Sequence, residues 1–409
     1  MVHNGDVQNA PVIPADPGAL PGPQGWQEPR EVKRARQTKL WIGFAIFLVF
    51  VGIGFGLAMM PLPYVIQSPG PTINVLGTQG DTQILEVSQS GAEEFFAERE
   101  DYVLLPAIRG HQDSDGQLRM VTVSEIGGPG STVRGADWLR AQFDPSSTIR
   151  RFSDVYDSSV TAQDVQNASS AQMESSHSSS TIAAAEYLNI PMDTTLTIVG
   201  AAPGSGAQGQ VEDGDVLLAM ELPDGREEIV DAPSVPFRVM KTVDPGSTVQ
   251  LRVLRDGEEV VVPVVSTGAQ GEPGSKLGIY LTADTQMPVS ADFHLERIGG
   301  PSAGLIFALG IVDQLSDHSL PGDQVIAGTG AISFAGDVIP IGGVRQKMYG
   351  ALRDGAQWFL VPLGNCQEVV GNEPKGLRVI PVETLADGVE AVDAIANGEG
   401  DALPSCPAA

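Results

Sequence analysis

The chain has 409 residues with 24 basic and 51 acidic side chains, so its formal net charge is −27. The surplus of negative charge lies after residue 60 and would repel nucleic acid and anionic lipid, which argues against a nucleic-acid-binding protein. No His-Glu-x-x-His or Cys-x-x-Cys ligand pattern occurs, so we expect no metal and no cofactor.

The first 60 residues divide into a polar tail and an apolar run. Residues 1–37 are rich in Pro, Gly and Gln and cannot bury a core, so we predict a disordered tail. The run from Leu40 to Met60 has 21 uncharged residues. As a helix it would be about 31 Å long, enough to cross a bilayer. We therefore predict a transmembrane helix over 38–61.

Charge around this run predicts its orientation. The basic residues before it are Arg30, Lys33, Arg34, Arg36 and Lys39, and no Lys or Arg follows until Arg99. This bias predicts a single-pass protein of the cell membrane with a cytoplasmic N-terminus and an extracytoplasmic remainder. A cleaved signal peptide is the alternative; the length of the run and the lack of an A-x-A site favour an uncleaved anchor.

Residues 62–190 mix strand and helix patterns. Apolar and polar residues alternate over 117–126, which predicts a strand. We predict a helix over 132–143, and we expect 162–188 to be helical toward its end. The Ser/His cluster from Ser175 to Ser180 is interpreted as a solvated helix face or loop and not as a metal site.

Residues 191–267 have a β-rich pattern. We expect a strand at 195–199, a short helix at 234–243, and a hairpin whose strands alternate on either side of Asp256-Gly257. This order resembles a PDZ domain, a module that takes an extended peptide, often a free C-terminus, as an added strand. A small β-domain without a ligand is the alternative.

Two glycine-flanked motifs carry the chemistry. The first is Gly299-Gly300-Pro301-Ser302-Ala303-Gly304, and 45 residues after the serine comes Lys347 in Gly342-Gly343-Val344-Arg345-Gln346-Lys347. A serine nucleophile needs a neighbour that takes its proton. Burial and the positive end of a helix dipole both lower a lysine pKa, so Lys347 is a candidate base. Glycines let a substrate carbonyl approach Ser302, and helix-start N–H groups can stabilise an oxyanion.

Together with 327–332 and 336–343, these motifs resemble the Lon family of serine-lysine peptidases. The resemblance covers roughly residues 61–397, and it implies that Ser302 is the nucleophile, Lys347 the general base and Thr329 the residue that orients the lysine amine. It also implies a hexamer, which Lon relatives commonly form. One position departs from the family: many Lon enzymes carry an acidic residue three before the serine, where this chain has Gly299.

The expected fold class is α/β (α+β): a Lon-type proteolytic domain, an inserted or adjacent small β-rich PDZ-like domain, and one preceding transmembrane helix. After Ser302 we expect helices at 302–315, 343–354 and 384–396 and strands at 325–334, 358–361 and 377–382. Residues 278–302 are too few to begin a Lon fold, so we expect 67–190 to supply its early part, with an independent domain there as the competing layout. The expected organisation is 1–37 cytoplasmic tail, 38–61 transmembrane helix, 62–190 N-terminal part of the ectodomain, 191–267 PDZ-like domain, 268–400 catalytic domain and 401–409 C-terminal tail.

The predicted function is an ATP-independent, membrane-anchored serine endopeptidase of extracytoplasmic proteins, with substrates presented by the PDZ-like domain. No G-x-x-x-x-G-K-[S/T] phosphate loop occurs. One alternative is an esterase, because residues 300–304 also fit G-x-S-x-G, although His318 is the one histidine after Ser302. Another is a catalytically silent scaffold that binds C-termini. Cys366 and Cys406 either pair outside the cell or remain free thiols.

Overall fold

The structure is a computed structural model, and it describes residues 30–97, 105–108, 115–268, 274–295 and 298–407. Most of the expected tail, residues 1–29, lies outside the described residues. The chain divides into two compact units, residues 1–60 and 61–409.

The described part of the first unit is one helix, α1 (Arg30–Met59). Its segment Lys39–Met59 has a mean hydropathy of 2.5, and none of its side chains is buried. Since the apolar side chains point outward all round, this segment has the length and composition of a membrane span or of a signal sequence.

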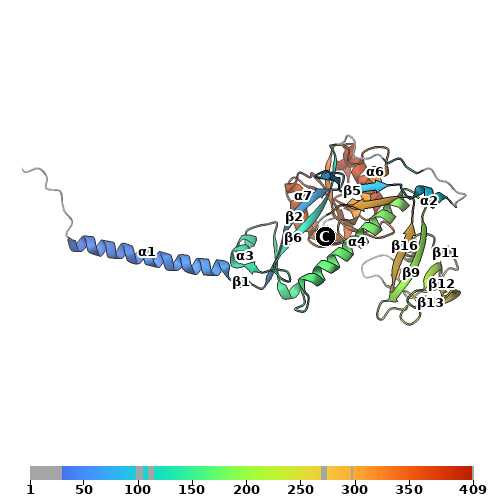
Figure 1. The fold of residues 1–409 in the computed structure, drawn as a ribbon, viewed down its shortest axis with the longest axis horizontal. Coiled ribbons are helices and arrows are strands. Elements are labelled where there is room, and N and C mark those ends of the chain that lie inside the picture. The colour runs from blue at the N-terminus through green and yellow to red at the C-terminus, as the bar shows by residue number, and fades with distance from the viewer. Residues whose placement is uncertain (1–29, 98–104, 109–114, 269–273, 296–297, 408–409) are drawn as a thin grey trace, which may run out of the picture. The chain divides into compact units, whose positions relative to one another are not determined.

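The second unit contains a six-stranded sheet with strand order β22-β21-β18-β6-β2-β8. Figure 1 shows two of its neighbouring strands, β2 and β6. Its strands are β2 (Tyr64–Asn74), β6 (Gln117–Ile126), β8 (Thr148–Arg151), β18 (Val325–Gly328), β21 (Trp358–Pro362) and β22 (Arg378–Val382). β18 pairs in parallel with β6 and with β21, whereas β2 is antiparallel to both β6 and β8. Three strands from before residue 152 and three from after residue 324 therefore share one sheet.

Helices cover both faces of this sheet. α4 (Ala162–Tyr187), α6 (Gly304–Leu315) and α9 (Leu385–Ala396) pack on one face, and α7 (Val344–Arg353) packs on the other. Successive strand residues point to opposite faces. Accordingly Ile326 belongs to the core cluster of α6 and α9, whereas its neighbour Ala327 belongs to that of α7.

The serine-rich part of α4 has one buried side, so the expectation of a solvated helix face or loop at 175–180 holds for the exposed Ser175 and Ser178 and is wrong for the other serines. Ser176, Ser179 and Ser180 are all buried where α4 packs on α6. Their small side chains let the two helices approach closely. The hydroxyls of Ser179 and Ser180 donate to carbonyl oxygens three residues earlier in α4, so their burial leaves no hydroxyl unsatisfied.

Residues 193–286, called the β-unit below, form a second sheet with its own hydrophobic core. Its antiparallel strands are β9 (Asp193–Ala201), β10 (Val216–Glu221), β11 (Glu227–Ile229), β12 (Thr248–Arg255), β13 (Glu258–Val265) and β16 (Ile279–Gln286), and its helix is α5 (Val235–Met240). The predicted hairpin is present, and Asp256 and Gly257 both have positive φ, as a type I′ turn requires. Because β16 pairs with β9, this sheet extends beyond the expected boundary at 267.

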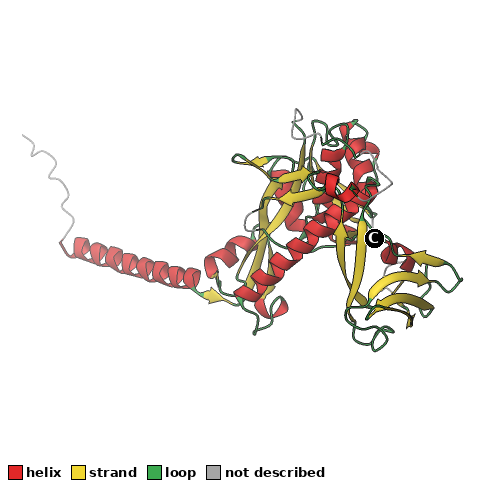
Figure 2. Cartoon of the chain, turned by 45° about the vertical axis from the view of Figure 1, so that its right-hand side comes forward, coloured by secondary structure: helices red, strands yellow, loops and turns green. Residues whose placement is uncertain are grey.

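Short elements complete the second unit (Figure 2). They are β1 (Pro61–Leu62), β3 (Thr78–Gln79), β4 (Thr82–Gln83), β5 (Leu85–Ser88), α2 (Ala92–Phe96), β7 (Val133–Arg134), α3 (Gly135–Gln142), β14 (Thr267–Gly268), β15 (Ser275–Lys276), β17 (Ser290–Phe293), β19 (Ala331–Ile332), β20 (Val338–Ile339) and α8 (Cys366–Val369), with 3-10 turns at Phe152–Asp154, Leu363–Asn365 and Gly400–Ala402. Cys366 and Cys406 form a disulfide with their Cα atoms 5.2 Å apart, so the paired alternative is the one present.

Candidate active site

Ser302 lies in a turn directly before α6, not inside the helix, which begins at Gly304. The carbonyl oxygen of Ser302 accepts a hydrogen bond of 2.9 Å from the N–H of Gly330. Within the described residues, the N–H groups of Ser302 and Ala303 donate to no backbone acceptor. They are therefore available to an anionic oxygen at the start of this helix.

Helix α4 holds the loop that precedes Ser302. The N–H of Gly300 donates to the carbonyl oxygen of Ser169 over 3.0 Å, and Ser176 Oγ donates to the carbonyl oxygen of Pro301 over 3.3 Å. A Cβ atom at position 299 would overlap Ser169 Oγ. This crowding gives a physical reason for glycine, and against an acidic side chain, three residues before the serine.

Lys347 is the fourth residue of α7, and its backbone N–H donates to the carbonyl oxygen of Gly343. Gly343 has a φ of 73°, a conformation that favours glycine, so the glycine sets the direction in which α7 starts. The lysine is 3% exposed and lies between the core residues Val344 and Met348. Burial lowers the pKa of Lys347 from 10.5 to about 7, against a smaller raising effect of the Glu368 carboxylate. Near neutral pH a large fraction of the amine is therefore uncharged.

Thr329 connects the lysine with the serine loop. It is fully buried at the end of β18, where its N–H donates to the carbonyl oxygen of Leu360. Its hydroxyl accepts a 3.1 Å hydrogen bond from Lys347 Nζ and donates a 3.0 Å bond to the carbonyl oxygen of Ser302. A neutral lysine amine that donates one hydrogen to Thr329 keeps its lone pair free to accept a proton.

The structure thus brings Ser302, Thr329 and Lys347 together, and it adds Ser169 and Ser176, which the sequence reasoning missed. A run of small residues on α4 was the available signal, because small side chains are needed where a helix packs closely on a loop. The burial of Ser176 depends on contacts with residues more than a hundred positions away, which no local pattern reveals.

His318 and His294 are both paired with carboxylates away from Ser302. His318 lies beyond the C-terminal end of α6, whereas Ser302 precedes its N-terminus, and a 12-residue helix is about 18 Å long. His318 is exposed and pairs with Asp317 and Asp393. His294 is also exposed and pairs with Glu86 on β5. These positions count against the G-x-S-x-G esterase alternative.

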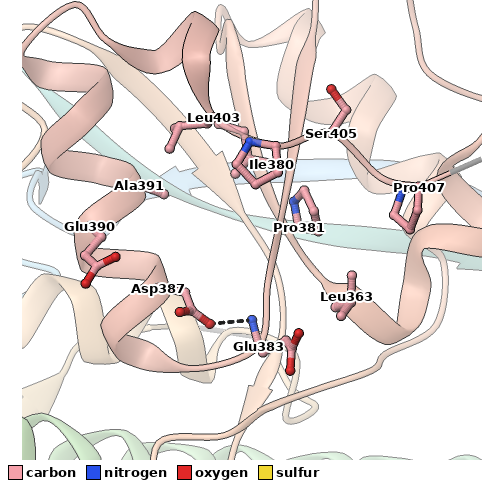
Figure 3. A pocket seen from close by; sticks show the side chains of 11 residues that line it. Leu363, Ile380, Pro381, Glu383, Asp387, Glu390, Ala391, Leu403, Ser405 and Pro407 are labelled. Carbon is pink, nitrogen blue, oxygen red and sulfur yellow. Dashed lines mark hydrogen bonds between the residues drawn. The ribbon is translucent and has the colours of Figure 1, made fainter.

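A cavity of about 390 Å³ lies elsewhere, between β22, α9 and the C-terminal tail. Figure 3 shows Leu403, Ser405 and Pro407 of the tail on one side of it and the acidic residues Glu383 and Asp387 on another. The Asp387 carboxylate accepts a hydrogen bond from the N–H of Glu383, so it is occupied in capping α9. The lining contains none of Ser302, Thr329 and Lys347, so this cavity is separate from the site. Among the described residues, no His/Cys/Asp/Glu group has the arrangement of a metal site.

Comparison with known proteins agrees with this geometry. Residues 297–393 match the family described as the Lon protease (S16) C-terminal proteolytic domain. The Lon protease of Azospirillum brasilense is 40% identical over 91 residues, which are 22% of this chain and 11% of that protein. Lon protease 2 of Bacillus subtilis is 34% identical over 110 residues, covering 26% and 19% of the two chains.

The archaeal Lon protease of Methanothermobacter thermautotrophicus is 35% identical over 107 residues, which are 24% of this chain and 16% of that protein. The matched segments thus span less than a fifth of the length of these three relatives and correspond to one part of each. The family match at residues 297–393 includes Ser302, Thr329 and Lys347. Residues 297–393 of this chain are accordingly similar to the C-terminal proteolytic domain of Lon serine proteases.

Proposed function

We propose that the chain is an ATP-independent serine endopeptidase in which Ser302 is the nucleophile, Lys347 the general base and Thr329 the residue that orients the lysine amine. The observation that carries the proposal is the buried Lys347 amine, whose pKa is lowered to about 7 and which donates to Thr329. A buried amine without a direct ion pair among the described residues destabilises the fold, and a role in proton transfer accounts for its presence.

The proposed reaction proceeds through an acyl-enzyme. Lys347 Nζ accepts the hydroxyl proton of Ser302 as Oγ bonds to the carbonyl carbon of the substrate peptide. The N–H groups of Ser302 and Ala303 stabilise the oxyanion of the tetrahedral intermediate. The protonated lysine then returns its proton to the leaving amine, and a water molecule, activated by the same amine, hydrolyses the ester.

We further propose that α1 anchors the protein and that residues 61–409 act outside the cytoplasm. The basic residues before the apolar segment and their absence directly after it support this orientation. The disulfide between Cys366 and Cys406 supports it as well, because disulfides persist in oxidising compartments. Substrates would then be unfolded or exposed segments of extracytoplasmic proteins, and the lack of a phosphate-loop motif supports cleavage without ATP.

In this proposal the β-unit is a PDZ-like domain inserted in the catalytic fold, and it presents substrates to the site. The chain leaves the central sheet after β8 and returns to it at β18, which supports the insertion. Lys241, which caps α5, forms an ion pair with Asp337, and the Phe237 and Phe334 rings lie 6.1 Å apart. Asp337 and Phe334 belong to the β19–β20 turn, between Thr329 and Lys347 in the sequence.

The test is cleavage of an unfolded protein by the full chain in detergent without nucleotide. Ser302→Ala and Lys347→Met should each abolish cleavage, and Thr329→Val, which keeps the side-chain volume, should reduce kcat by about 10-fold or more. Lys347→Met fills the buried site with an apolar side chain, so a cavity would not be the cause of lost activity. Wild-type protein that cleaves nothing but binds C-terminal peptides would instead support the scaffold alternative.

A further inference from the structure

The turn formed by residues 363–369 packs against the segment that leads into α7. A Cβ atom at Gly364 would lie 2.5 Å from Pro340 Cγ, so the two segments are in close contact. Asn365 follows in this turn and is only 3% exposed. Its Oδ1 accepts from the N–H of Ile341 over 2.9 Å, and its Nδ2 donates to the carbonyl oxygen of Ile341 over 2.8 Å. The amide thus satisfies both backbone groups of Ile341, as a neighbouring strand would.

Ile341, which Asn365 holds by two hydrogen bonds, lies directly before Gly342 and Gly343, the two glycines that precede α7. Gly342 has no atom within 4 Å of the position that a Cβ would take, and a glycine backbone can adopt more conformations than that of other residues. A change of backbone angles at Gly342 would move the first turn of α7, and with it the Lys347 amine. The two hydrogen bonds from Asn365 to the Ile341 backbone oppose such a movement. This matters for catalysis because a displacement of about 1 Å in a catalytic group can lower the rate by about 100-fold.

The same turn brings a negative charge toward Lys347. Asn365 Nδ2 lies 3.3 Å from Glu368 Oε1, a further hydrogen bond that orients this carboxylate. Glu368 is on α8, which packs on α7, and it favours the charged form of Lys347. The other titratable side chains on elements packed against α7 are Tyr64 on β2 and Arg119 and Glu125 on β6. Glu368 is the charged group that acts on the Lys347 pKa.

We propose that Asn365 is a positioning residue for the Lys347 amine and that Glu368, oriented by Asn365, adjusts the charge of that amine. Asn365 acts through the Ile341 backbone and touches no reacting atom. The disulfide at Cys366 holds the adjacent residue and so steadies the same turn. This inference rests on the proposed role of Lys347 as the general base.

The test measures kcat and KM against pH for the full chain in detergent. Asn365→Ala should lower kcat by about 10- to 100-fold with little change in KM. Glu368→Gln should move the acid limb of kcat to lower pH, because removing the carboxylate lowers the pKa of Lys347 and leaves the amine neutral at lower pH. The matched controls are the exposed neighbours Gln367→Ala and Glu373→Gln, which should leave both parameters unchanged.

The outcomes separate this inference from the proposed function. If wild-type cleavage depends on Ser302 and Lys347 but Asn365→Ala behaves like Gln367→Ala, the positioning role is wrong. If the acid limb of kcat lies at the same pH for Glu368→Gln as for the control Glu373→Gln, the electrostatic role of Glu368 is wrong. If Asn365→Ala does not fold, the pH profile of Glu368→Gln still tests the proposal, because Glu368 is exposed and its substitution should leave the fold intact. Activity that survives Ser302→Ala would overturn the proposed function itself.

Discussion

At the scale of single residues, the protein keeps a lysine where an apolar side chain would be more stable. Lys347 has an ordinary pKa of 10.5 when the chain is unfolded and about 7 when folded. Between these values the unfolded state binds more protons, so stability increases as the pH rises from about 7 to 10.5. At and below pH 7 the full cost of charging the buried amine applies. The depressed pKa that suits a base is therefore also a source of instability at neutral pH.

Lys347→Met should consequently stabilise the fold while abolishing cleavage. At pH 7 the gain in free energy of unfolding is expected to be up to roughly 5 kcal/mol, and it should vanish as the pH approaches 10.5. Denaturant unfolding of both proteins at several pH values measures the difference. The exposed Lys375→Met is the control and should show no such dependence on pH. An equal gain at every pH would mean that packing, and not charge, causes it.

Position 299 offers a second test at this scale. Gly299→Ala places a methyl group against Ser169 Oγ, so the loop before Ser302 should shift and kcat should fall, by about 10-fold or more. Adding Ser169→Gly removes the obstructing side chain and should restore part of the rate, although glycine inside α4 costs about 1 kcal/mol of stability. A double-mutant cycle on kcat measures the coupling. Independent effects of the two substitutions would contradict the contact.

At the scale of elements, local patterns were enough for much of the fold. The hairpin of β12 and β13 follows from alternation around Asp256-Gly257, and α7 follows from a glycine pair before an amphipathic stretch. The Thr329 hydroxyl joins the Lys347 amine and the Ser302 carbonyl oxygen in one hydrogen-bonded group, a proximity that the family resemblance implied and that residue spacing alone does not give. The full length of α4 and the burial of its serines did not follow, because both depend on packing against α6, far along the chain.

The central sheet leads to a prediction about fragments. β18 pairs with β6 along one edge, residue by residue from Val325 opposite Gln117 to Gly328 opposite Met120. A fragment of residues 268–409 lacks β2, β6 and β8, so it would expose that edge of β18 and the apolar side chains that these strands cover. We expect the fragment to aggregate or remain unfolded and to cleave nothing. Circular dichroism and peptide cleavage measure this, with residues 61–409 as the comparison.

Adding residues 61–190 in trans, which include α4, is the sharper version of this experiment. If β2, β6, β8 and α4 supply the missing strands and the helix that packs on α6, the two fragments together should gain ordered secondary structure by circular dichroism and recover some activity. A 268–409 fragment that folds and cleaves alone would show that the N-terminal strands are dispensable, and the insertion of the β-unit in the catalytic fold would be wrong.

At the scale of the whole molecule, the proposed compartment depends on the fate of α1. An anchor leaves the protein in the membrane with its N-terminus attached, whereas a signal sequence leaves a soluble product that starts near residue 61. The two native cysteines are paired with each other, so an introduced cysteine is expected to be the one reactive thiol. Gln79 lies in the exposed strand β3, after the apolar segment, and Gln8 lies before that segment.

Gln79→Cys in the full chain should react with a membrane-impermeant maleimide in intact cells, whereas Gln8→Cys should react only after lysis. The reason is the charge bias around residues 40–60, which favours a cytoplasmic N-terminus. Both variants should stay with the membrane fraction after carbonate extraction. The reverse labelling pattern would place the serine-lysine site in the cytoplasm. A soluble Gln79→Cys protein that has lost its first 60 residues would instead identify α1 as a signal sequence, and the disulfide would then belong to a secreted peptidase.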